Sequence, residues 1–369
     1  MKIQMSLLAV AIAFSSHAMA DGNNSDLDQI GFNNQAEIAQ TPRDGGNNNS
    51  NHRSDVEQTG VYNKTSVYQS GVTSTVRINQ LGGGNKTTAE QYGSTERGFI
   101  DQVGALNTAN LHQKSFKNTA RISQSGYRNL SNSSQGDSGP NSSGKHNVLS
   151  VTQEGGFNVS TATQSGSYER ARVAQAGLMH DSDILQDGEN NRASVSQEGR
   201  FHNSTVTQTG TNSQALVVQT GSRIDSTVTQ SGNEQRARVI QGGSSHDSLV
   251  TQSGSANTAL VTQSDMLQYS DISQSGSENL AVNTQSGYFN LAIVEQTGTN
   301  SDSLITQTGL NDHARVQQSG SGQRSDILQQ AGGFMSFAAN RAHVVQTGAA
   351  NTSSVTQTGG GNIANVMQY

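Results

Sequence analysis

Several residue types are scarce in this chain, and each shortage narrows the possible structures. There is no cysteine, so no disulfide contributes to stability. There is no tryptophan, and only 31% of the residues are hydrophobic, so a conventional apolar core is not expected. Charged residues make up 14% of the chain and the net charge is −6. This is too little charge to keep a chain extended, and its sign argues against nucleic acid as the main partner.

The abundant residues are arranged periodically. In the central part of the chain a glutamine recurs at every eleventh position, and this register holds for seventeen consecutive residues. They are Gln153, Gln164, Gln175, Gln186, Gln197, Gln208, Gln219, Gln230, Gln241, Gln252, Gln263, Gln274, Gln285, Gln296, Gln307, Gln318 and Gln329. Such regularity indicates a repeat fold in which every unit packs on its neighbours.

The same register extends to both sides, from Gln29 to Gln368, and gives thirty units. Three spacings are longer than eleven, which predicts loop insertions near residues 41–47, 136–142 and 331–336. The only prolines, Pro42 and Pro140, fall in the first two insertions, as expected if the rest is paired backbone. If two units form one coil, even- and odd-numbered units end at opposite edges of the solenoid. The first two insertions follow even-numbered units and the third follows an odd-numbered one, so the third should emerge at the edge opposite to the first two.

Each unit reads as a β-strand followed by a turn. A small residue lies four positions before the glutamine and usually Val or Ile two before it, with Asn often six before, as in Asn191, Ala193, Val195 and Gln197. Alternate positions share one face of a strand, so these residues should point inward. Glycine follows two positions after the glutamine in 24 of the 30 units, where it permits a positive φ. We therefore expect strands of about seven residues.

The small residue alternates between Ser and Ala from Ser182 to Ala281, so the structural period is two units. This predicts an all-β fold, a β-solenoid of about 15 stacked strand-turn-strand coils with 22 residues per coil and cross-β stacking as in amyloid. The Ser and Ala columns should lie on opposite walls of a flat coil. The alternation slips once, where Ala281 is followed by Ala292.

Stacking in register places identical side chains above one another, so that inward Gln and Asn amides can bond to their copies on adjacent coils. Neither end carries an atypical capping repeat. The inward residues of the first unit are Asn23, Ser25, Leu27 and Gln29, and those of the last are Asn362, Ala364, Val366 and Gln368. Uncapped strands that match the interior repeat are templates for another copy, so both ends are predicted self-assembly surfaces.

Residues 1–20 have the pattern of a secretory signal peptide. Lys2 gives the positive start, residues 6–14 form a short apolar run, and Ala18-Met19-Ala20 is a typical cleavage site. The exported chain is expected to begin at Asp21, with residues 21–369 forming the solenoid. The apolar run is too short to span a bilayer, so no membrane span is expected.

The repeat resembles the curlin repeat, in which Ser and Gln frame one strand, a Gly-containing turn follows, and Asn-x-Ala leads to a second Gln. Two stretches carry this resemblance: Asn203-Ser204 to Gln208-Thr-Gly210 with Ala215 to Gln219, and Ser353 to Gln357 with Asn362-Ile-Ala364 to Gln368. The likeness covers essentially all of residues 23–369. The terminal Gln368-Tyr369 is similar to the end of the family's major fibre subunit.

This resemblance implies a secreted structural subunit of extracellular amyloid fibres that serve biofilm formation and adhesion. It implies a homopolymer, with a nucleator subunit, an outer-membrane secretion pore and periplasmic accessory factors as partners. No enzyme activity, cofactor, metal or nucleic acid is expected. A monomeric solenoid that acts as an adhesin or stalk is the alternative.

Three other signals suggest different functions. His180, His202 and His246 lie six residues before a glutamine, where stacked imidazoles could bind metal or respond to pH; the simpler interpretation is that His replaces Asn. Outward threonines such as Thr205 and Thr227 are similar to ice-binding arrays but also favour strands in general. The acids Glu154, Asp187, Glu189 and Glu198 lie near turns and are interpreted as solvated charges rather than catalytic groups.

Overall fold

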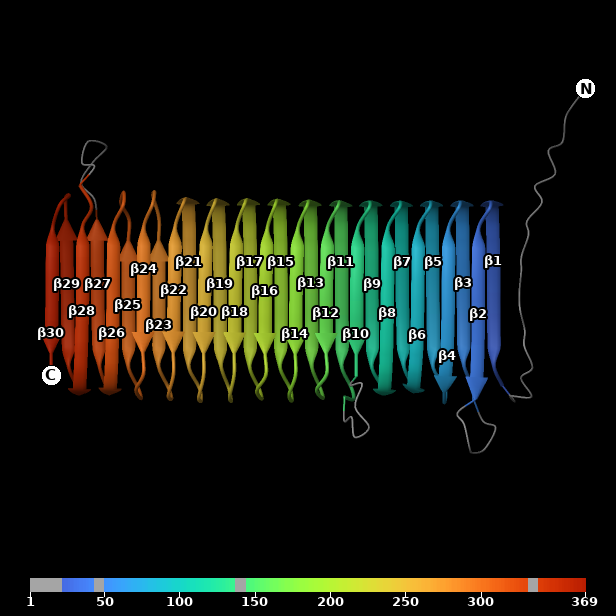
Figure 1. Cartoon of the computed structure of the whole chain (residues 1–369), viewed down its shortest axis with the longest axis horizontal. Coiled ribbons are helices and arrows are strands. Elements are labelled where there is room, and N and C mark those ends of the chain that lie inside the picture. The colour runs from blue at the N-terminus through green and yellow to red at the C-terminus, as the bar shows by residue number, and fades with distance from the viewer. Residues whose placement is uncertain (1–21, 43–49, 137–143, 331–337) are drawn as a thin grey trace, which may run out of the picture. The chain divides into compact units, whose positions relative to one another are not determined.

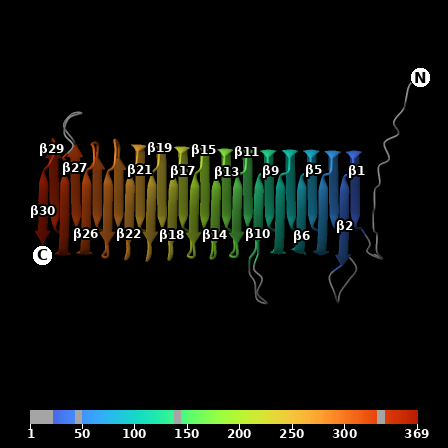
Figure 2. The ribbon, with the colours of Figure 1, turned by 45° about the horizontal axis from the view of Figure 1, so that its top comes forward.

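The computed structural model describes residues 22–42, 50–136, 144–330 and 338–369. The chain divides into two compact units, Met1–Glu189 and Asn190–Tyr369. All regular structure in the described residues is β-strand, and within them no helix is long and apolar enough to cross a membrane. Within each unit, Figure 1 shows successive strands pointing in opposite directions, and Figure 2 shows that alternate strands form two layers.

The first unit contains fourteen strands, β1 to β14. The odd-numbered strands, which form one sheet, are β1 (Asn24–Phe32), β3 (Arg53–Val61), β5 (Thr75–Gly83), β7 (Arg97–Ala105), β9 (Thr119–Tyr127), β11 (Val148–Gly156) and β13 (Arg170–Leu178). The even-numbered strands, which form the other, are β2 (Gln35–Pro42), β4 (Lys64–Gly71), β6 (Lys86–Ser94), β8 (Thr108–Phe116), β10 (Leu130–Gln135), β12 (Val159–Gln164) and β14 (Asp181–Gln186).

The second unit contains sixteen strands, β15 to β30. One sheet consists of β15 (Arg192–Arg200), β17 (Gln214–Ser222), β19 (Arg236–Ser244), β21 (Thr258–Met266), β23 (Leu280–Gln285), β25 (Asp302–Gln307), β27 (Arg324–Gln330) and β29 (Thr352–Thr358). The other consists of β16 (Asn203–Gln208), β18 (Asp225–Gln230), β20 (Asp247–Gln252), β22 (Tyr269–Gln274), β24 (Leu291–Gln296), β26 (His313–Ser321), β28 (Arg341–Ala349) and β30 (Ile363–Gln368).

All strand pairing in both units is parallel and in register. In the first unit Gln58 pairs with Gln80 and Gln69 with Gln91, so equivalent residues are 22 positions apart. In the second unit the same shift relates Val217 to Val239. The predicted all-β solenoid with two strands and 22 residues per turn is confirmed.

The core consists of the inward positions that the repeat predicts. In β15 the residues Ala193, Val195 and Gln197 are buried and their sequence neighbours are not. The buried aliphatic residues are mostly Val, Ile and Ala, all almost completely shielded from solvent. These side chains are short, which allows the two sheets of a unit to pack closely, and β-branched residues suit the pleated strand.

The glycine that lies two residues after most ladder glutamines is required by close packing as well as by backbone conformation. Gly60 and Gly82 have φ values of 121° and 122°. A Cβ atom on Gly60 would lie 2.0 Å from the carbonyl oxygen of Gly82 on the next turn. The glycines therefore form a column in which backbone packs directly on backbone, and a larger residue would push the turns apart.

A second left-handed residue in each turn was not predicted from the sequence. It lies four positions after the ladder glutamine and has a positive φ even though it is seldom glycine, as at Tyr62 (58°) and Phe157 (58°). Left-handed backbone costs a non-glycine residue about 1–2 kcal/mol. The one sequence signal was the presence of asparagine at this position, at Asn33, Asn190, Asn212, Asn300 and Asn311, because Asn tolerates this conformation well.

The Ser/Ala slip coincides with an exchange of strand types. Before the slip, nine-residue strands such as β19 contain Ala and six-residue strands such as β20 contain Ser. After it, the nine-residue strands β26 and β28 are even-numbered and contain Ala314 and Ala342, and the odd-numbered β25 contains Ser303. At the slip itself Asn283 takes a core position and donates a hydrogen bond to the Ser270 hydroxyl at 2.9 Å. The slip therefore exchanges the two strand types between odd and even positions.

Most of the three predicted insertions lie outside the described residues. Thr41 and Pro42, expected in the first insertion, are instead the last residues of β2, where Pro42 pairs with Gly71. Proline is tolerated there because a strand end need not donate every N–H. The strands that precede the first two insertions, β2 and β10, belong to the same sheet of the first unit, and β27, which precedes the third, is an odd-numbered strand of the second.

One pair of core residues shows how tightly the two sheets of the first unit pack. Leu111 on β8 is larger than the Val usual at its position, and Gly98 on β7 is smaller than the usual Ala or Ser. A Cβ atom on Gly98 would lie 2.7 Å from Leu111 Cδ2. The two exceptions compensate each other, which preserves the spacing between the sheets.

We expect Gly98→Ala to destabilise the chain by about 1–3 kcal/mol, because the added methyl group overpacks the core against Leu111. Adding Leu111→Val, which restores the usual residue, should recover most of this loss. Chemical denaturation of the two variants and the parent measures the effect. Equal stability of the parent and Gly98→Ala would show that the sheets are not packed this closely.

Candidate functional site

The predicted ladder glutamines form two columns in each unit. In the first unit Gln58 Nε2 donates to Gln80 Oε1 at 2.7 Å, and Gln80 Nε2 donates to Gln102 Oε1 at 2.8 Å. In the second unit the same bonds join Gln230, Gln252 and Gln274, each at 2.8 Å. Every such amide donates toward the C-terminal neighbour, so all the bonds in a column point the same way.

All seventeen glutamines from Gln153 to Gln329 are buried, none more than 2% exposed. The second N–H of the same amide reaches a backbone carbonyl sixteen residues earlier, as Gln252 Nε2 does to Arg236 O at 3.1 Å. This cross-link joins one sheet of a unit to the other, and no feature of the repeat pattern predicts it. Each glutamine thus holds adjacent turns at a fixed distance and also holds the two sheets of a unit at a fixed distance.

The asparagines six positions before the ladder glutamines act mainly on the backbone. Asn85 Oδ1 accepts the N–H of Asn107 on the next turn at 3.1 Å. Asn85 Nδ2 donates to Leu81 O at 3.4 Å and to Gly104 O, on the next turn, at 3.0 Å. Expected contacts between equivalent amides also occur, as between Asn129 Nδ2 and Asn107 Oδ1 at 3.1 Å. The asparagine column therefore holds each turn to the one above.

His180, His202 and His246 occupy this asparagine column, and their Nε2 atoms reproduce the contact of the asparagine amide nitrogen with the carbonyl four residues earlier. Their Nε2 atoms lie 3.0–3.1 Å from the carbonyl oxygens four residues earlier, those of Ala176, Glu198 and Gly242. His246 Nδ1 accepts the N–H of Gln268 at 3.4 Å. Burial lowers the pKa of His202 and His246, which favours the neutral ring. These contacts support the interpretation of histidine as a substitute for asparagine, and no group in the described residues has the geometry of a metal site.

The predicted end residues lie on, or directly before, strands that are hydrogen-bonded on one side only. β1 and β2 are the first strands of their sheets, and β29 and β30 the last. Asn23 Oδ1 accepts the N–H of His52 at 3.0 Å, and Leu27 and Gln29 are half-buried, with Ser25 exposed. Asn362, Ala364, Val366 and Gln368 are likewise only half-buried, whereas equivalent interior residues are buried. No described strand caps these edges.

The other candidate residues lie on the outer surface. Thr205 pairs with Thr227 and Thr207 with Thr229 on β16 and β18, and the next strand continues with Leu249, which ends the threonine array. The acids Glu154, Asp187, Glu189 and Glu198 are all exposed, as expected of solvated charges.

The serines that lie four residues before a ladder glutamine form a buried column, and burying their hydroxyl groups costs free energy that the sequence pattern does not reveal. The hydroxyls of Ser204, Ser226 and Ser248 are buried, and each lacks a hydrogen-bond partner in the described structure. An unsatisfied buried hydroxyl costs about 1–3 kcal/mol. Alanine fills the same position in other strands without this penalty, as at Ala215.

The triple variant Ser204→Ala/Ser226→Ala/Ser248→Ala should therefore be more stable than the parent, by about 1 kcal/mol per site. The exposed Ser273→Ala on β22 is the control and should change stability by less than about 0.5 kcal/mol. Thermal and denaturant unfolding measure both. A less stable triple variant would mean that these hydroxyls are satisfied.

Three buried acids, Glu96, Glu169 and Asp312, take places in the turn column where an amide is usual, and Glu96 shows what this requires. Glu96 is fully buried, and its Oε2 accepts the N–H of Asn118 at 2.9 Å. Unlike an asparagine, an ionised carboxylate cannot donate to the carbonyls that surround this position, but a protonated one can. Burial raises the pKa of Glu96 from 4.5 to about 8, and its hydrogen bonds from Asn118 oppose the shift only in part.

Because the folded-state pKa of Glu96 is raised, its contribution to stability is fully present below about pH 4.5 and is lost as the pH rises to about 8. The difference of about 3.5 pH units corresponds to roughly 5 kcal/mol. Glu96→Gln should remove this pH dependence, since Gln235 serves in the same column, where its Oε1 accepts the N–H of Asn257. Unfolding curves from pH 4.5 to 9 test this, and identical pH profiles for parent and variant would contradict it.

Four segments between residues 180 and 309, most of them in the second unit, match a known family. The model of the curlin associated repeat matches residues 180–210, 188–221, 222–254 and 284–309. No curated protein matches the chain significantly. The matched segments span the glutamine, serine and glycine columns described above, and curlin repeats on a β-solenoid point to a structural protein rather than an enzyme. These four matches support a curlin-like family for this chain.

Proposed function

We propose that this chain is the structural subunit of an extracellular, curli-like fibre that grows by adding copies end to end. The observation that carries the proposal is that the two ends match each other in sequence and geometry. Both ends expose parallel strand edges with unpaired backbone groups, which are templates for further strands. A biofilm and adhesive role follows from the family likeness.

The inward residues at the two ends are of the same kinds. The odd-numbered β29 would meet β1 of the next copy, placing Ser353 against Ser25, Val355 against Leu27 and Gln357 against Gln29. The even-numbered β30 would meet β2 in the same way. There Ala364, Val366 and Gln368 would face Ala36, Ile38 and Gln40. The junction would thus continue the interior repeat.

The hydrogen-bonding groups at the ends are also complementary. At the C-terminal end Gln368 Nε2 donates to Thr352 O at 2.9 Å and keeps a second N–H without a partner in the described chain. At the N-terminal end the described chain provides no donor for Gln29 Oε1. A donor end and an acceptor end give head-to-tail addition a fixed polarity.

The Ser/Ala slip supports the same arrangement. The N-terminal end has Ser25 on an odd strand and Ala36 on an even one, but from Ser182 to Ala281 this assignment is reversed. The slip restores it, so that Ser353 and Ala364 at the C-terminal end continue into Ser25 and Ala36 of the next copy. Without the slip, Ser would face Ala at both strands of the junction.

We propose further that residues 1–20 direct export and are removed, so that fibres form at the cell surface. A nucleator subunit, an outer-membrane secretion pore and periplasmic accessory factors are the proposed partners, on the basis of the family likeness alone. A monomeric adhesin with the same solenoid is the rival function, and it predicts a chain that stays soluble at high concentration.

We expect Val366→Lys to reduce fibre elongation at least tenfold, because it places a charge in the centre of the junction while leaving the interior turns intact. Seeded growth followed by thioflavin fluorescence and electron microscopy measures the rate. The control is Met367→Lys on the same strand, whose side chain is 60% exposed and points outward. Fibre growth at equal rates in both variants would exclude growth through this end.

A further inference from the structure

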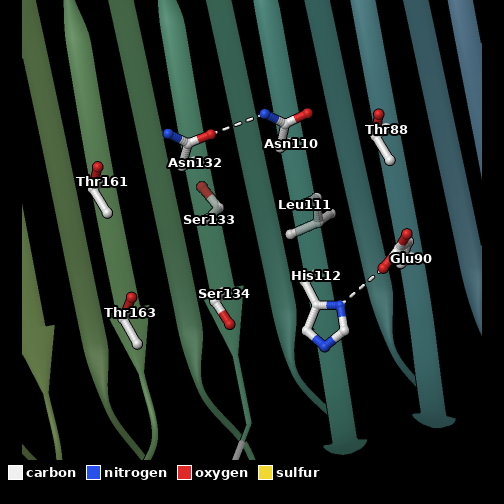
Figure 3. Close-up of a pocket in the computed structure, with 10 residues that line it drawn as sticks. All are labelled: Thr88, Glu90, Asn110, Leu111, His112, Asn132, Ser133, Ser134, Thr161 and Thr163. Atoms are coloured by element: carbon white, nitrogen blue, oxygen red, sulfur yellow. Dashed lines mark hydrogen bonds and ion pairs between the residues drawn. The ribbon is translucent and has the colours of Figure 1, made fainter. Parts of the chain in front are cut away.

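The outer surface of the even-numbered sheet in the first unit has a hollow that the fibre proposal does not use. Its volume is about 340 Å³, within the usual range for ligand sites. It is lined by outward residues of β6, β8, β10 and β12, with Leu111 and Ser133 between them (Figure 3). Nothing in the junction between copies requires these residues, since strand addition involves only inward groups and strand edges.

The polar residues of the hollow form two straight rows across the strands. One row runs Thr88, Asn110, Asn132, Thr161, and strand register aligns its members. The second row runs Glu90, His112, Ser134, Thr163. Neighbouring strands are about 4.8 Å apart and the rows are about two residues apart along each strand, roughly 6.6 Å. The hollow therefore presents a ladder of polar groups parallel to the stacking direction.

The side chains of the hollow are held in place but retain hydrogen-bonding capacity. Asn110 Nδ2 donates to Asn132 Oδ1 at 2.9 Å, and His112 Nδ1 lies 3.2 Å from Glu90 Oε2 (Figure 3). Among the described residues neither Asn132 Nδ2 nor Asn110 Oδ1 has a hydrogen-bond partner, and the same holds for the side-chain hydroxyl of Thr161. The rows can thus accept and donate further bonds without rearrangement.

Aromatic rings adjoin the rows on one side. The ring of Tyr92 lies 5.3 Å from that of His112 and 5.2 Å from that of Tyr68. Tyr92 is 41% exposed and also lines a second hollow of about 400 Å³ with Lys114 and Phe116. An exposed tyrosine offers an apolar face beside its polar hydroxyl, which suits ligands with both kinds of surface.

The charge of the hollow limits its ligand. Its only ionisable lining groups are Glu90 and His112, which form a pair with each other. The hollow offers no basic cluster for a phosphate or nucleic acid, and it combines exposed apolar carbon atoms with the polar groups of the two rows. Planar amide, carboxylate and imidazole groups beside an aromatic face suit a neutral molecule that has many hydroxyls and an apolar ring face.

From these features we propose that the outer face of β6, β8, β10 and β12, with Tyr92, binds a neutral polysaccharide chain. The sugar hydroxyls bond to Asn110, Asn132 and the Glu90–His112 pair, and one sugar ring stacks on Tyr92. The polysaccharide lies across the strands, along the two rows. This site is complete within one copy, so the proposal does not depend on fibre formation.

Binding of soluble neutral hexasaccharides to the full-length chain tests the proposal, with cellohexaose, xylohexaose and maltohexaose as probes. Isothermal titration should detect at least one of them, and hexagalacturonate should bind more weakly because it is anionic. Tyr92→Ala and the double variant Asn110→Ala/Asn132→Ala should each weaken binding at least tenfold. Circular dichroism should show the parent fold in both, since the changes are on the outer face.

The matched control is Thr205→Ala/Thr227→Ala, on the outward face of β16 and β18 in the second unit, which should bind as the parent does. The neutral hexasaccharides should be tested up to about 10 mM, roughly ten times the Kd of a weak, millimolar site. If none of them binds at that concentration, the proposal is overturned. Binding that the Tyr92 and Asn110/Asn132 variants leave unchanged would also overturn it, since the saccharide would then occupy another surface.

Discussion

The structure depends on one constraint: each inward side chain must be compatible with a copy of itself one turn away. Parallel, in-register pairing places each residue directly beside the equivalent residue of the next turn, as it does for Gln80 and Gln102 and for Asn85 and Asn107. A buried polar group is fully satisfied in such stacking only if it both donates and accepts. Primary amides meet this requirement, which explains why they replace leucine as the most regular buried residue.

The exceptions obey the same rule. Histidine enters the asparagine column because Nδ1 and Nε2 provide one acceptor and one donor, as at His246. Glutamate enters at Glu96, where its raised pKa favours the protonated form that can donate as well as accept. Serine hydroxyls such as that of Ser226 fit by size alone, and their polarity remains uncompensated. The tolerance of the amide columns is therefore set by hydrogen bonding, and that of the serine column by side-chain volume.

Much of this was predictable from sequence because periodicity reports contacts between equivalent residues. The eleven-residue spacing of Gln153 to Gln329 gave the strands, the inward face and the two-strand turn. The left-handed residue at Tyr62 or Phe157 was missed because many residue types occupy this position, and asparagine is found at only five of the turns. Contacts between non-equivalent residues, such as Gln252 with Arg236 O, or Gly98 beside Leu111, were also hidden. These contacts depend on the distance between the two sheets, and the length of the repeat does not predict that distance.

The common direction of the glutamine bonds makes each stack of turns electrically polar. Backbone dipoles largely cancel, because successive strands of a turn run in opposite directions. The side-chain amides do not cancel, since both columns of a unit donate toward the C-terminal side, as Gln58 and Gln69 do. Two such stacks lying side by side would have lower electrostatic energy with their axes opposed. The amide columns that order one stack of turns internally would therefore also favour an antiparallel arrangement of neighbouring stacks.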